Sequence, residues 1–169
     1  MVIKYWEVLY LSNVWIINLK DNRDGSDKND DKKFGICLQY NIVAIGWGNE
    51  SSRIDEAKAF NRANNAIKGM KRGDYIWTKN PKSKQEVYLF KIVDDIINDY
   101  IIEGNSFFIN NDISKSRNVE LVEHFSEKSD FIDGLEKSDI IARSTAENVS
   151  EEKRNYLIKA TNDYVKSKK

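Results

Sequence analysis

The chain has 169 residues, 40% of them hydrophobic, and its 27 basic residues balance its 27 acidic residues. This length fits one domain with its own core, and we expect residues 1–169 to form it. Zero net charge argues against a protein that binds nucleic acid mainly by neutralising phosphates, so any such contact needs a local basic patch or a base pocket. The single cysteine, Cys37, excludes an intramolecular disulfide and a cysteine-rich zinc site.

The apolar runs and the lone thiol also bear on the cellular compartment of the protein. No apolar run approaches the roughly 18 residues that a membrane span requires. The N-terminal segment carries charges within its apolar stretch, which predicts a strand and not a signal peptide. We therefore expect a cytoplasmic protein without membrane contact, where a lone thiol stays reduced.

In chain order, alternation over Val2–Leu11 predicts a strand, and Val14–Leu19 predicts a second strand that forms a hairpin with it. Residues 20–33 have no apolar member, which predicts a surface loop. Phe34–Tyr40 predicts a helical turn. Asn41–Asn49 is the most apolar run of the chain and predicts a central strand buried on both faces.

Three- and four-residue apolar spacing predicts an amphipathic helix over 54–71, followed by a tight turn at Lys71–Asp74. A second helix is expected to begin near Ser150. Strands at 75–78 and 87–93 are predicted to form a hairpin, and further short strands are predicted at 107–109 and 118–125. Residues 94–104 predict a turn and another strand, and 140–143 predict a short strand or an extended segment. These elements indicate an α+β fold, with a curved sheet or small β-barrel and flanking helices.

The order of elements resembles the PUA-like superfamily, especially its EVE-type branch, over about residues 14–145. The resemblance is carried by Val14-Trp15-Ile16-Ile17, Ala44-Ile45-Gly46-Trp47-Gly48, Met70 through Trp77, Tyr88 through Ile92, and Arg143-Ser144-Thr145. It implies a small β-barrel with flanking helices that holds a flipped, modified base, as in modules of restriction-type defence systems. The strand at 2–11 and the loop at 20–33 depart from that pattern.

Three tryptophans, Trp15, Trp47 and Trp77, are therefore candidates for an aromatic pocket that stacks on a base. Gly46 and Gly48 would clear space beside Trp47 for a flat ligand. The alternative for each tryptophan is that it fills the core of a small domain.

Basic and hydroxyl side chains are candidates for contacts with the nucleic-acid backbone. Lys71, Arg72 and Lys79 flank the predicted turn and hairpin, where a solvated charged surface is the alternative. Arg143–Thr145 could contact a phosphate or cap the last element.

Enzymatic activity is not expected. His124 is the only histidine, and no cysteine–histidine spacing predicts a metal site. Nucleophile-elbow and phosphate-loop sequences are absent as well. We expect a module without cofactor or metal that binds DNA or RNA. The alternatives are a protein-interaction or inhibitor module of a mobile element or defence system, and a binder of a small nucleotide-like ligand.

Overall fold

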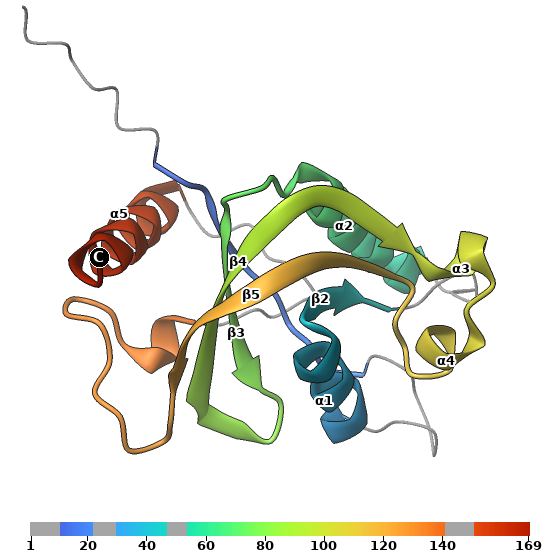
Figure 1. Cartoon of the computed structure of the whole chain (residues 1–169), viewed down its shortest axis with the longest axis horizontal. Coiled ribbons are helices and arrows are strands. Elements are labelled where there is room, and N and C mark those ends of the chain that lie inside the picture. Colours follow the sequence, from blue (N-terminus) through green and yellow to red (C-terminus); the bar gives the residue numbers. More distant parts are fainter. Residues whose placement is uncertain (1–10, 22–29, 47–53, 141–150) are drawn as a thin grey trace, which may run out of the picture.

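The computed structural model describes residues 11–21, 30–46, 54–140 and 151–169 (Figure 1). It is an α+β structure built around one mixed sheet. The strands are β1 (Val14–Ile16), β2 (Ile42–Ile45), β3 (Tyr75–Asn80), β4 (Ser83–Asp99) and β5 (Lys115–Phe125). The helices are α1 (Asp30–Tyr40), α2 (Ile54–Gly69), α3 (Tyr100–Glu103), α4 (Ser106–Ile109) and α5 (Glu151–Ser167), with a 3₁₀ turn, η1, at Lys137–Asp139.

The five strands lie in the order β1-β3-β4-β5-β2. β1 runs parallel to β3, and the other neighbouring pairs are antiparallel. Within the described ranges β1 and β2 are the two edges of the sheet, and it does not close into a barrel. Of the two architectures expected from the sequence, the curved sheet with flanking helices is compatible with this arrangement and the closed barrel is wrong.

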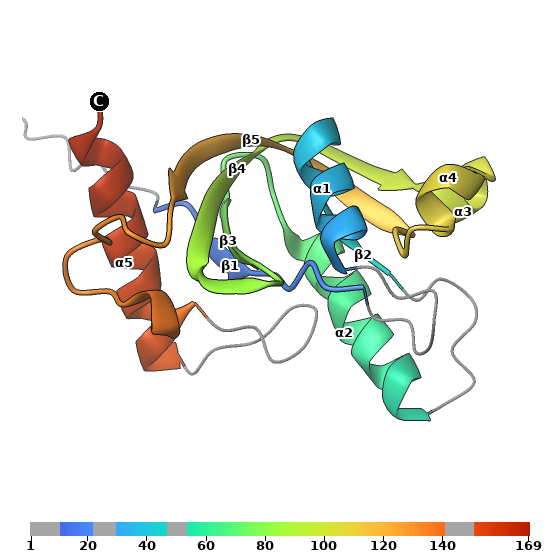
Figure 2. The same ribbon diagram turned by 90° about the horizontal axis from the view of Figure 1, so that it is seen from below.

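Two hydrophobic clusters cover the two faces of the sheet. α1 and α2 contribute to the first cluster, and α5 contributes to the second. Figure 2 shows α5 on one side of the sheet and α1 with α2 on the other. Side chains alternate along each strand, so Ile76 joins the first cluster while its neighbours Tyr75 and Trp77 join the second.

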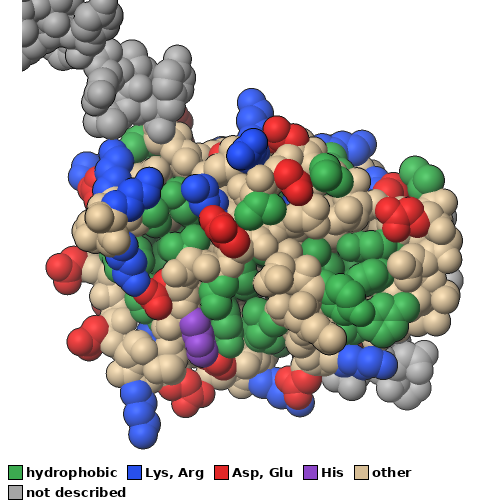
Figure 3. Space-filling model, in the orientation of Figure 1, with side chains coloured by type: hydrophobic (Ala, Val, Ile, Leu, Met, Phe, Trp, Pro, Cys, Tyr) green, Lys and Arg blue, Asp and Glu red, His purple; other side chains and the backbone are tan. Residues whose placement is uncertain are grey.

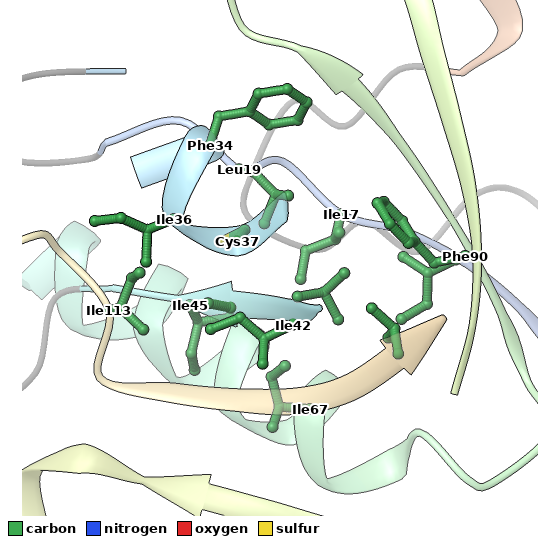
Figure 4. Close-up of a cluster of buried hydrophobic side chains, with 14 of the residues drawn as sticks. Ile17, Leu19, Phe34, Ile36, Cys37, Ile42, Ile45, Ile67, Phe90 and Ile113 are labelled. Atoms are coloured by element: carbon green, nitrogen blue, oxygen red, sulfur yellow. The ribbon is translucent and has the colours of Figure 1, made fainter. Parts of the chain in front are cut away.

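β2 confirms the predicted strand that is buried on both faces, because its four residues are at most 3% exposed. The prediction that this strand is central is wrong, since β2 forms an edge. Figure 4 shows why an edge strand can be so apolar: Ile42 and Ile45 lie between the side chains of α1 and Ile67 of α2.

Three further predictions about the bounds of elements are wrong, and helix caps account for two of them. The chain over 94–99 continues β4, and the Asp99 carboxylate then caps α3 by accepting from the backbone N–H groups of Ile101 and Ile102. Residues 107–109, predicted as a strand, lie in α4, whose first turn is capped by Asn105. α1 begins at Asp30, inside the predicted loop and four residues before the predicted helical turn.

Strongly periodic segments are confirmed. α2 spans 54–69, the β3–β4 hairpin turns at Pro81, and Gly73 takes a φ of +91° in the predicted tight turn. The C-terminal helix begins at Glu151. The predicted strands at 2–11 and 140–143 fall mostly outside the described residues. In the part of the chain that the structure describes, no helix has the length and apolar character of a membrane span.

Candidate functional site at the end of strand β2

The predicted pocket tryptophans do not all come together. Trp15 of β1 pairs with Ile76 of β3, so Trp77 is offset by one residue and points to the opposite face of the sheet. Trp77 is 0% exposed, donates its indole N–H to the Thr161 hydroxyl at 3.0 Å, and packs against aromatic rings of the second cluster. Trp77 therefore fills the core, and it does not share a pocket with Trp15.

Trp15 is half-buried against the first cluster. Its indole N–H donates to the Asp74 carboxylate at 3.0 Å, and the guanidinium of Arg154 lies 5.8 Å from its ring centroid. Asp74 also accepts from the backbone N–H groups of Asn13 and Lys71, at 3.2 and 3.0 Å. The Lys71–Asp74 turn thus has a structural task, which is to join β1 to the end of α2 through one carboxylate.

The two basic side chains of this turn, Lys71 and Arg72, are exposed. Lys79, which lies in β3, is partly exposed. The backbone N–H of Arg72 donates to Asp95 at 2.9 Å, which places an acidic side chain beside the turn. The other predicted site residues, Trp47, Gly48 and Arg143–Thr145, lie outside the described residues.

Gly46 follows β2. The structure gives a reason for a glycine at this position that differs from the one predicted from the sequence. A Cβ placed on Gly46 would lie 2.0 Å from Oδ1 of Asp112 and 2.3 Å from its Cγ. The space that the glycine leaves is therefore filled by a carboxylate of this chain. Asp112 itself adopts a φ of +59° and is 4% exposed.

Lys33 of α1 pairs with this carboxylate. Its Nζ lies 2.8 Å from Oδ2 of Asp112, and the two side chains are 0% and 2% exposed. A buried ion pair gains little net stability, because removing both charges from water offsets most of their attraction. Such pairs mark places where the sequence retains costly polar groups, and functional sites are prominent among those places.

The pair lies in dry surroundings. Cys37, one helical turn after Lys33, is buried, and this burial raises the pKa of its thiol to about 12. The positive charge of Lys33 opposes that rise and the negative charge of Asp112 adds to it. The thiol is therefore protonated and unreactive, and it is not a nucleophile.

Ser114 holds the same end of β2 from the backbone side. Its hydroxyl lies 3.1 Å from the carbonyl oxygens of both Ile45 and Gly46 and donates to them. Its backbone N–H donates to the carbonyl oxygen of Ile45 at 2.8 Å. We call Gly46, Lys33, Asp112 and Ser114 the Gly46 cluster. Of these four residues, only Gly46 stands out in the sequence. No local motif marks the others, because Lys33 and Asp112 are 79 positions apart in the chain.

A second polar group lies on the β4–β5 surface. The Glu86 carboxylate accepts from the Tyr88 hydroxyl at 2.7 Å and the Asn80 amide at 2.7 Å, and it lies 2.8 Å from Nε2 of His124. The hydrogen bond from Tyr88 is the main reason that the pKa of Glu86 is lowered, while burial and this carboxylate raise the pKa of Tyr88. The rings of Tyr88 and His124 stack at 4.2 Å.

An aromatic patch lies where α1 ends beside α4. Tyr40 and Phe107 are 48% and 45% exposed, and both contact the buried Phe108, with ring centroids 5.2 and 5.3 Å away. Ile102 and Ile109 are also exposed nearby in the chain. Figure 3 shows hydrophobic side chains gathered at this end of the visible face.

Within the described ranges, no three His, Cys, Asp or Glu side chains are grouped as a metal site requires. No protein-family model matches the chain, and no curated protein matches it.

Proposed function

We propose that this chain is a non-enzymatic nucleic-acid-binding module that holds an unpaired base, modified or plain, next to the C-terminal end of β2. The observation that carries the proposal is the buried Lys33–Asp112 pair, packed directly against Gly46. It supports a site here because the pair is costly to bury and lies beside the residue that precedes Trp47 in the sequence.

Within this proposal the tryptophans have separate roles. Trp47 stacks on the base, because it directly follows Gly46 in the sequence. Trp77 is a core residue, and Trp15 is a structural residue bound to Asp74. A stacked base contributes roughly 1–3 kcal/mol to binding, so one aromatic side chain can dominate the affinity of a protein without net charge.

The backbone contacts come from Lys71 and Arg72, which are exposed. Two phosphate contacts on a single strand give a slope of about −1.4 in a plot of log affinity against log salt. We expect the wild-type chain to show a slope of about this size. In a Lys71→Ala/Arg72→Ala variant, we expect affinity to lose this dependence on salt. A slope that the double variant leaves unchanged would exclude these two side chains from the interface.

A panel of single-stranded DNA and RNA oligonucleotides, with plain or methylated cytosine and adenine, tests the function by fluorescence anisotropy. Trp47→Ala is expected to weaken binding at least about fivefold, in line with the loss of about 1–3 kcal/mol of stacking. Trp77→Phe is the matched control, because Trp77 is buried in the second cluster, and this variant is expected to keep the wild-type affinity. The proposal fails if no oligonucleotide binds or if Trp47→Ala binds as tightly as the unmodified chain.

A second candidate function is favoured by the aromatic patch, because contiguous exposed apolar groups mark interaction surfaces. Tyr40 and Phe107 would then contact a protein partner. The test compares stoichiometric partners purified with the wild-type chain and with a Tyr40→Ser/Phe107→Ser variant. A partner lost only from the double variant supports this function, and one retained equally by both excludes this surface.

A further inference from the structure

His124 presents one face of its imidazole ring to solvent. The ring lies parallel to that of Tyr88, with 4.2 Å between the centroids and 9° between the planes, so Tyr88 covers one face. The side chain is still 39% exposed, and within the described ranges no second aromatic ring contacts it. Figure 3 shows the histidine, in purple, on the visible face beside hydrophobic side chains. The exposed area therefore belongs to the outer face of the ring and to its edge.

The ring of His124 is held in this orientation. Its Nε2 lies 2.8 Å from Oε1 of Glu86, whose carboxylate also accepts from the Tyr88 hydroxyl and the Asn80 amide, each at 2.7 Å. Tyr88 in turn stacks on the buried Phe90, with 8° between the planes. An aromatic group that is fixed before binding loses little conformational entropy when a ligand stacks on it.

The side of β5 next to the outer face of this ring has no strand neighbour in the described part of the chain. β2 pairs with β5 only over residues 115–118, so residues 119–125 lie next to β4 alone. Because Tyr88 lies on β4, the outer face of His124 points away from β4 and toward this unpaired side. Leu121, which is 49% exposed, lies on the same face of the sheet, since it pairs with Phe90 of the first cluster. A planar ligand here finds an aromatic ring to stack on and an aliphatic neighbour.

Glu86 supplies a hydrogen-bond acceptor at the edge of the ring. A carboxylate has about four lone-pair sites. Among the described residues, the bonds of Glu86 to Tyr88 and His124 use Oε1 and the bond to Asn80 uses Oε2, which leaves a site on Oε2 for a ligand. The hydrogen bond from Tyr88 is the main cause that lowers the pKa of Glu86 below 4.5, so the carboxylate is ionised at neutral pH and only accepts. The group that it binds is an N–H donor, such as the amino group of adenine or cytosine.

We propose that His124 and Glu86 form a binding site for an amino-bearing nucleobase, which stacks on the outer face of the imidazole and donates an amino hydrogen to Glu86. The site makes no phosphate contact. Glu86 and Glu123 both contact His124, and within the described ranges only Glu123 has a lysine partner, Lys168. A phosphate group beside the ring would meet the negative charge of Glu86.

The base comes from a free nucleoside or from a single strand whose phosphates point away from the site. The site uses none of the residues of the Gly46 cluster, so it stands independently of the function proposed above.

The test uses the fact that His124 is the only histidine, so its ring C–H signals in a proton NMR spectrum report on this site alone. Adenosine is the first probe, and purine riboside, which lacks only the amino group, is its matched control. We expect adenosine to move these signals upfield in a saturable way, because a stacked ring shields the protons above its face. Purine riboside is expected to bind about fivefold more weakly, since it has no amino group for Glu86. AMP is expected to bind no more tightly than adenosine.

Two substitutions of the same residue separate stacking from bulk. His124→Phe keeps a flat ring, whereas His124→Leu keeps apolar bulk without one. In equilibrium dialysis with adenosine, we expect His124→Leu to raise Kd at least about fivefold and His124→Phe to raise it less than about twofold. Tyr156→Ala is the control, because it removes a half-exposed ring from α5 on the other side of the sheet and is expected to leave Kd unchanged. Urea midpoints of all variants show whether unfolding contributes to any loss.

A second arm repeats the measurements with a single-stranded oligonucleotide of adenines in place of adenosine. The expected pattern with adenosine supports a site for a free nucleoside, and the same pattern with the oligonucleotide alone supports a site for a base within a strand. The proposal is overturned if neither probe moves the His124 signals, if purine riboside binds as tightly as adenosine, or if His124→Phe loses as much affinity as His124→Leu.

Discussion

Lys33 and Asp112 form an ion pair inside the protein, with 2.8 Å between Nζ and Oδ2 and at most 2% of either side chain exposed. Breaking such a pair leaves a buried charge that has lost its oppositely charged partner. We expect Lys33→Met and Asp112→Asn each to lower the free energy of unfolding by about 3–5 kcal/mol, measured by urea denaturation.

The double variant Lys33→Met/Asp112→Asn removes both charges and keeps a residue that tolerates the positive φ at position 112. It is expected to recover most of the stability that either single change loses. Additive losses in the double variant would show that the two side chains act independently, contrary to the short contact between them.

Asp74 joins β1 to the turn after α2 by accepting three hydrogen bonds, from Trp15, Asn13 and Lys71. Asp74→Ala leaves these partly buried donors without an acceptor, so we expect a loss of about 3 kcal/mol in unfolding free energy. The matched control is Asp95→Ala, because the exposed Asp95 accepts from the turn's backbone at Arg72. The control is expected to change stability by only about 0.5 kcal/mol. Equal effects would contradict the role given to Asp74.

Arg117 is a buried cation at the C-terminal end of α2. It is 1% exposed and donates to the carbonyl oxygens of Ile67, Met70 and Asp94. The carbonyls of Ile67 and Met70 lie at the end of α2, where the helix dipole is negative, and that of Asp94 belongs to β4. Arg117→Lys cannot reach all of them, and we expect a loss of about 3 kcal/mol together with faster hydrogen exchange in the last turn of α2.

The control for Arg117 is Lys115→Met, two residues earlier on the same strand. Lys115 is partly exposed and bonds Asn64 at 2.8 Å, so its removal is expected to cost about 1 kcal/mol or less. Unchanged exchange in α2 after Arg117→Lys would mean that the arginine does not cap the helix.

Glu86 predicts a pH dependence of stability. The hydrogen bond from Tyr88 is the main cause that lowers its pKa in the folded chain below the ordinary value of 4.5. A lowered folded-state pKa gives stability that is present above pH 4.5 and is lost as the pH falls through the folded-state value. Glu86→Gln should therefore lower stability at neutral pH and flatten its decline in acid. Urea midpoints between pH 7 and about pH 3 test this, and an acid limb as steep as that of the wild-type chain would contradict it.

The parts of the fold that local patterns specify were predictable. The apolar run at Ile42–Ile45 and the helical spacing of α2 appear where periodicity places them. The sequence does not show that β2 lies at an edge of the described sheet, with side chains of α1 and α2 packed against it. It also cannot tell a strand from α4 at residues 107–109, where a three-residue apolar run fits both and Asn105 as a cap decides.

The candidate site was predictable only in part. Gly46 stands out in the sequence, but the reason for a glycine at this position does not. Asp112, which fills the space beside it, comes from a distant segment and takes a left-handed conformation. The faces of Trp15 and Trp77 depend on the register of β1 against β3, where Trp15 pairs with Ile76. A shift of one residue would have put both indoles on the same face.

Dependence of binding on the base itself tests the central claim most directly. Anisotropy titrations compare the best-bound single-stranded oligonucleotide with a strand of the same length and phosphates in which every position is abasic. Binding that holds a base predicts a Kd at least about fivefold higher for the abasic strand, since stacking contributes roughly 1–3 kcal/mol. Equal Kd values for the two strands would show that the chain contacts only the backbone, and would contradict the claim that it holds a base.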